Sequence, residues 1–100
     1  MTMTRDEIRD RVAESLREFL ISLGQDAVEI QDRTRPIGDL GLDSADGVDW
    51  VLDLEGIGFN IPTDFNPFVD DRRKRARRFG EVVEALTPYY TGTTEVSRHD

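Results

Sequence analysis

The residue with the clearest chemical potential in this sequence is Ser44. It follows Gly41, Leu42 and Asp43, and it precedes a segment whose apolar residues recur at helical spacing. A serine in this position can cap a helix, take part in a cation-binding loop, act as a nucleophile or carry a covalently attached group. The function of the protein depends on which of these roles Ser44 has.

A capping role accounts for part of the pattern. Serine and aspartate are preferred N-cap residues, and replacing one of them with alanine costs about 1 kcal/mol. Either Asp43 or Ser44 is therefore expected to cap a helix that runs to about Glu55. One capping side chain does not account for the acids that follow it.

Two of the chemical roles do not fit the neighbouring residues. A calcium loop starting at Asp39 would place Ser44 at the sixth position, where glycine is needed, and Trp50 at the twelfth, where a glutamate ligand belongs. A nucleophilic serine needs a general base and a group that orients this base. The sequence has no cysteine, and its one histidine, His99, is the residue before the last. We therefore expect that the protein is not an enzyme.

The composition indicates one small globular domain. The chain has 100 residues, of which 37% are hydrophobic and 34% are charged. No segment approaches the roughly 18 consecutive apolar residues of a membrane span. The N-terminal residues have no signal-peptide character, so the expected location is the cytoplasm.

Apolar residues at helical spacing predict three main helices. The first covers about residues 5–23 and opens with a capping box formed by Thr4 and Glu7. The second is the helix that ends at about Glu55, and the last covers about ten residues from Phe79. No segment shows the alternation of a strand.

These elements predict an all-α fold, a three- to four-helix bundle with a long first loop and a basic insertion before the last helix. Thr63 or Asp64 would cap a minor turn of helix. The domain would span residues 1–90, with residues 91–100 as a flexible C-terminal tail. The expected core walls are the aliphatic residues Leu16, Leu20, Val48, Leu52, Val83 and Leu86.

The charge is unevenly distributed along the chain. The net charge is −8, yet residues 72–78, RRKRARR, contain six of the 13 basic residues and no acid. This run could pair with the chain's own acids and extend the last helix, or form a docking site for an acidic partner. Nucleic-acid or lipid binding is disfavoured by the surrounding acids and by the lack of interleaved aromatic residues.

Residues 40–44, LGLDS, resemble the motif that marks the acyl carrier protein family. Three further segments occur in the family's order: LE at residues 54–55, IP at 61–62 and FGEVV at 79–83. The resemblance covers roughly residues 5–87. It implies an acyl-carrier-like bundle that acts as a monomer.

The resemblance implies that Ser44 carries a 4′-phosphopantetheine arm, attached from coenzyme A by a phosphopantetheinyl transferase, with Asp43 beside the attachment point. The arm's thiol would hold a fatty acyl, polyketide or aminoacyl group as a thioester. A helix N-terminus suits this role, because its unpaired N–H groups and the positive end of its dipole stabilise a phosphodiester. No nucleic-acid partner is expected.

The resemblance also implies that acids on the second helix dock onto basic patches of acyl-transferring or condensing enzymes. The docking residues would be Asp43, Asp46, Asp49, Asp53, Glu55 and Ala45. Two alternatives stay open: a merely solvated acidic face, and a carrier-fold adaptor that has lost its arm.

Two residues of this helix depart from the family pattern. Ala45 stands where the family usually has leucine, which reduces the apolar contact offered to a partner. Gly47 lies inside the helix at a cost of about 1 kcal/mol relative to alanine. It either loosens the first turns or allows the close approach of a partner or of the acyl chain.

Overall fold

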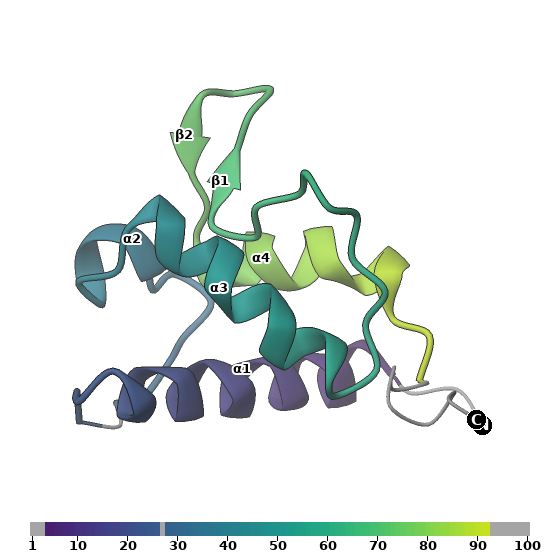
Figure 1. The fold of residues 1–100 in the computed structure, drawn as a ribbon, viewed down its shortest axis with the longest axis horizontal. Coiled ribbons are helices and arrows are strands. Elements are labelled where there is room, and N and C mark those ends of the chain that lie inside the picture. Colours follow the sequence, from purple (N-terminus) through teal and green to yellow (C-terminus); the bar gives the residue numbers. More distant parts are fainter. Residues whose placement is uncertain (1–3, 27, 93–100) are drawn as a thin grey trace.

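Helices make up most of the secondary structure in the computed structural model, which describes residues 4–26 and 28–92. Figure 1 shows α1 along one side of the molecule, α3 and α4 packed above it, and a β-hairpin projecting from the opposite side. The elements in chain order are α1 (Arg5–Ser22), α2 (Pro36–Asp39), α3 (Ser44–Glu55), β1 (Val69–Asp70), β2 (Arg75–Ala76), α4 (Phe79–Leu86) and the 3-10 turn η1 (Thr87–Tyr89).

The first helix forms where the sequence predicts it. The Thr4 hydroxyl accepts a hydrogen bond from the N–H of Glu7 at 3.2 Å, and the Glu7 carboxylate accepts one from the N–H of Thr4 at 2.8 Å. These two bonds form the expected capping box. After the last turn, Gly24 adopts a φ of +88°, a conformation that favours glycine.

The second long helix, α3, also has the predicted limits, because Asp43 is its N-cap and Gly56 is its C-cap. Its orientation differs from the prediction. Val48 and Leu52, expected in the core, are 55% and 71% exposed, whereas Trp50 and Leu54 are fully buried. The prediction for Val48 and Leu52 was therefore wrong, because the face with the larger Trp50 side chain turns inward.

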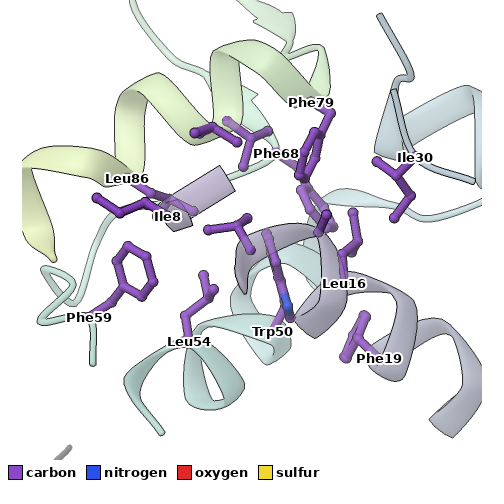
Figure 2. Close-up of a cluster of buried hydrophobic side chains, with 14 of the residues drawn as sticks. Ile8, Leu16, Phe19, Ile30, Trp50, Leu54, Phe59, Phe68, Phe79 and Leu86 are labelled. Atoms are coloured by element: carbon purple, nitrogen blue, oxygen red, sulfur yellow. The ribbon is translucent and has the colours of Figure 1, made fainter. Parts of the chain in front are cut away.

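Trp50 lies in the hydrophobic core, where it contacts α1 and the segment before the hairpin (Figure 2). Its indole Nε1–H donates to the hydroxyl of Ser15 on α1 at 3.0 Å. Its ring stacks on Phe68 with the two centroids 5.4 Å apart. One side chain thereby joins α1, α3 and the segment before the hairpin. The other predicted core residues are buried as expected: Leu16, Leu20, Val83 and Leu86.

The basic run forms a hairpin, so the predicted extension of the last helix is wrong. β1 and β2 pair antiparallel, with Val69 opposite Ala76 and Asp70 opposite Arg75. The Asp70 carboxylate accepts hydrogen bonds from the N–H groups of Arg72 and Arg73 at 3.1 and 3.2 Å, which favours a turn over a helix at this point. The fold is therefore mostly helical with a small two-stranded sheet.

An ion pair fixes the second hairpin strand to α4. Both terminal nitrogens of Arg75 donate to the Glu81 carboxylate, at 3.1 and 2.7 Å. The hydrogen bond from Arg75, together with that from the backbone N–H of Arg78, lowers the pKa of Glu81 from 4.5 to about 2. Part of the basic run thus pairs with the chain's own acids, as one interpretation of the sequence expected.

Two smaller expectations have different outcomes. The minor helical element is α2, which lies within the predicted long loop, and no helix forms at Thr63 or Asp64. Of the predicted tail, Thr91 and Gly92 donate their N–H groups to the carbonyl oxygen of Gly58 at 2.7 and 3.0 Å. The rest of the tail, including His99, lies outside the described residues. Among the described helices, none is long and apolar enough to cross a membrane.

The Ser15–Trp50 hydrogen bond yields a stability prediction. Replacing Ser15 with alanine would leave the buried indole N–H without its acceptor, which we expect to lower the free energy of unfolding by about 1–3 kcal/mol. Urea denaturation followed by tryptophan fluorescence measures this loss. The matched control is Ser22→Ala, because Ser22 is exposed and its hydroxyl donates to the backbone carbonyl of Phe19 within its own helix. Equal losses in the two variants would contradict the assigned role of the Ser15 hydroxyl.

Candidate functional site

Ser44 is the first residue of α3 and is exposed. The helix start is held by a reciprocal capping box: the Asp43 carboxylate accepts from the N–H of Asp46, and the Asp46 carboxylate accepts from the N–H of Asp43, both at 3.0 Å. In the described part of the chain, the Ser44 hydroxyl makes no hydrogen bond. Asp43 therefore caps α3 and leaves the neighbouring hydroxyl accessible.

The predicted docking residues are distributed along α3. Ala45, Asp49 and Asp53 are exposed, whereas Asp46 and Glu55 are half-buried. Asp46, Asp49 and Asp53 follow one another at intervals of three and four residues, which places them along one side of the helix. Asp46 also has a structural role, because its carboxylate completes the capping box.

An apolar stripe beside these acids was missed at the sequence level. Ser44, Val48 and Leu52 are spaced four residues apart, so the two exposed aliphatic side chains continue along the helix from the serine. The large apolar side chain of Trp50 is the feature of the sequence that could have revealed this stripe. Placing its ring in the core fixes the inner face of α3 and leaves Val48 and Leu52 outside.

The loop before the hairpin lies against the start of α3. Asn66 donates its side-chain N–H to the carbonyl oxygen of Ser44 at 2.8 Å, and its side-chain oxygen accepts from the N–H of Phe68 at 3.0 Å. Asn66 thus links the serine backbone to the segment that carries the Trp50 stacking partner.

The absence of a side chain at Gly47 allows this loop to pack against α3. It is buried, and a Cβ atom added there would collide with the side-chain oxygen of Asn66 and approach Phe68 to 3.0 Å. The close approach that Gly47 allows is made by Asn66 of the same domain, and not by a partner or an acyl chain. Loosening of the first helical turns stays a prediction. The glycine serves packing within the domain.

A surface depression of about 420 Å³ opens beside Ser44. It runs between α3 and the first strand of the hairpin. Its lining residues are Ser44, Val48, Thr63, Asp64, Phe65, Asn66, Val69 and Asp71. A group attached to the Ser44 hydroxyl would have this depression next to it.

The polar groups around Ser44 are mostly engaged within the domain, and the Ser44 hydroxyl itself is exposed. The carboxylates of Asp43 and Asp46, which neighbour Ser44 in the sequence, accept hydrogen bonds from the helix backbone. Within residues 4–26 and 28–92, no three metal-binding side chains gather into a possible metal site. The helix start offers unpaired N–H groups and a positive dipole end to an anionic substituent.

The contact between Gly47 and Asn66 yields a second prediction. Glycine-to-alanine changes inside helices usually stabilise a protein by up to about 1 kcal/mol, but we expect Gly47→Ala to destabilise this one. Urea denaturation of Gly47→Ala, Asn66→Ala and the double variant measures the coupling. In the Asn66→Ala background the Gly47 substitution should cost less. A stabilising effect in the wild-type background would show that Asn66 does not occupy this space.

Comparisons with protein-family models, curated proteins and solved structures found no match to this chain. A functional assignment therefore depends on the LGLDS motif and on the geometry around Ser44. That geometry combines an accessible hydroxyl at a helix N-terminus, a flanking acidic and apolar helix face, and an adjacent depression.

Proposed function

We propose that this chain is an acyl carrier protein, a divergent stand-alone member of the phosphopantetheine-binding carrier family. The observation that carries the proposal is the position of Ser44 in the LGLDS motif, with its side chain exposed at the first residue of α3. The helical core of α1, α3 and α4 supports a carrier-like bundle with a hairpin inserted before α4.

The residues at the start of α3 fit a 4′-phosphopantetheine group. The Ser44 hydroxyl would be esterified by a phosphopantetheinyl transferase, with coenzyme A as the donor. Asp43 and Asp46 hold the first turn in place, and the positive end of this helix would stabilise a phosphodiester attached to the Ser44 hydroxyl. When bound, the arm supplies a thiol on which an acyl group travels as a thioester.

The exposed face of α3 is the proposed docking surface for the partner enzymes. Asp49 and Asp53 would meet basic patches on the transferase and on acyl-transferring or condensing enzymes, while Val48 and Leu52 would contact apolar side chains there. Charge pairs at an interface rim mainly steer association and set orientation, whereas buried apolar contacts contribute more to affinity. The acidic net charge disfavours nucleic acid as a partner.

The proposal includes a cytoplasmic location and a monomeric state.

Covalent labelling tests the proposal directly. The purified chain is incubated with coenzyme A and a transferase of broad specificity, and intact mass is then recorded. We expect wild type and the control Ser22→Ala to gain the mass of one phosphopantetheine group, and Ser44→Ala to gain none. Equal gain by Ser44→Ala would refute attachment at this serine. Wild type that gains no mass would favour the carrier-fold adaptor instead.

The docking surface has a separate test in the rate of the same labelling reaction. Leu52→Ala should leave stability unchanged within about 0.5 kcal/mol, because the side chain is 71% exposed. The loss of one interface anchor should lower kcat/KM of the transferase by about fivefold, which corresponds to about 1 kcal/mol. Ile21→Ala is the control, since Ile21 is 54% exposed on α1. Equal rates for the two variants would place the docking surface elsewhere.

A further inference from the structure

Arg77 stands at the base of the hairpin in a fixed position. One terminal nitrogen donates to the carbonyl oxygens of Asn66 and Pro67, at 3.0 and 3.2 Å. Its guanidinium carbon lies 5.2 Å from the centre of the Phe65 ring. Because a guanidinium has five N–H donors, the other nitrogens of Arg77 keep donors available for a ligand.

Two further arginines of the run are more weakly engaged. Arg73 reaches the Asp70 carboxylate only at 3.7 Å. The Arg72 side chain forms no ion pair with any residue that the structure describes, although its backbone N–H donates to Asp70. Cationic side chains with uncommitted donors therefore occur both at the turn of the hairpin, with Arg72 and Arg73, and at its base, with Arg77.

These arginines surround a depression of about 520 Å³, lined by Asp70, Arg72, Arg73 and Arg77. Three guanidinium groups against one carboxylate give this depression a net positive lining. Guanidinium groups bind planar oxyanions with two parallel hydrogen bonds. The lining thus has the chemistry of a carboxylate or phosphate site.

The arginine depression and the one beside Ser44 both adjoin a third depression. A middle depression of about 210 Å³ shares three residues with the arginine end: Asp70, Arg72 and Arg77. The same middle depression shares five residues with the Ser44 end: Asp64, Phe65, Asn66, Val69 and Asp71. The three depressions therefore adjoin one another along a line from Ser44 to the arginines, and we refer to this row of depressions as the trough.

We infer that the arginine end of this trough binds the terminal carboxylate of an acyl group carried on the arm at Ser44. The inference rests on the proposed carrier function and adds a cargo class to it, acyl groups with a free carboxylate. Asp64 and Asp71, which line both the depression beside Ser44 and the middle one, repel such a carboxylate, whereas Arg72, Arg73 and Arg77 attract it. The charges along the trough therefore favour an anionic group at its far end.

The absence of cysteine from the chain allows a matched test. In the protein loaded with phosphopantetheine, the arm provides the one thiol. Its thiolate displaces iodide from carbon-13-labelled iodoacetate to give a carboxymethyl arm, or from iodoacetamide to give a carbamoylmethyl arm. The two products have nearly the same shape and differ in charge.

We expect the carboxymethyl form to shift the NMR signals of Arg72, Arg73 and Arg77 relative to the carbamoylmethyl form. The labelled carboxylate should titrate about one pH unit lower than in the same form of Arg72→Gln/Arg73→Gln, because nearby guanidinium groups favour its charged state. The double variant keeps Arg77 and its anchoring bonds. The control Arg11→Gln/Arg33→Gln removes two exposed arginines elsewhere and should behave as wild type.

Three results would overturn the inference: identical hairpin signals in the two alkylated forms, an unchanged carboxylate titration in the Arg72→Gln/Arg73→Gln variant, or equal shifts from an equimolar amount of free acetate added to the carbamoylmethyl form. The last result would show a general anion site that does not depend on the arm. Failure of the carrier function appears earlier and separately, as the absence of any mass gain at Ser44.

Discussion

The structure depends on the burial of Trp50. An indole ring contributes a large apolar surface to a small core, but its N–H must find an acceptor once it is removed from water. Ser15 on α1 provides this acceptor at 3.0 Å, and Phe68 covers the ring. The hydrogen bond restricts the rotation of α3 against α1, because a turned helix would leave both polar groups unpaired.

The rotation of α3 determines which residues reach the surface. With Trp50 and Leu54 directed inward, the helical repeat places Ser44, Val48 and Leu52 outward together. The proposed attachment point and its apolar docking stripe therefore follow from a requirement of the core. Burial of Trp50 also positions the loop before the hairpin, because Phe68 in this loop stacks on the indole ring. Asn66 of the same loop then bonds the backbone of Ser44 and packs against Gly47 at the start of α3.

The sequence predicted those features whose causes are local. The Thr4–Glu7 capping box fixes the start of α1, and the limits of α3 follow from the capping aspartate and from Gly56. The inner face of α3 was not predictable from apolar spacing alone, because apolar residues occur on two sides of this helix. The hairpin was missed because its two-residue strands have no visible alternation. It depends on the Asp70 turn and on the Arg75–Glu81 pair, which tertiary packing brings together.

The separation of charge around Ser44 is the remaining consequence of this architecture. The acids of α3 and the arginines of the hairpin would attract each other if the chain allowed contact, yet Arg75 pairs with Glu81 on α4 and Arg77 is held over Phe65. These anchors keep the hairpin on the far side of the trough. In the proposed carrier, Ser44 therefore lies between an acidic face suited to basic partner enzymes and a basic end suited to an anionic cargo. A carboxylate held at the arginines would leave Asp49, Leu52 and Asp53 free for a partner, whereas Val48 belongs both to the docking surface and to the lining of the trough.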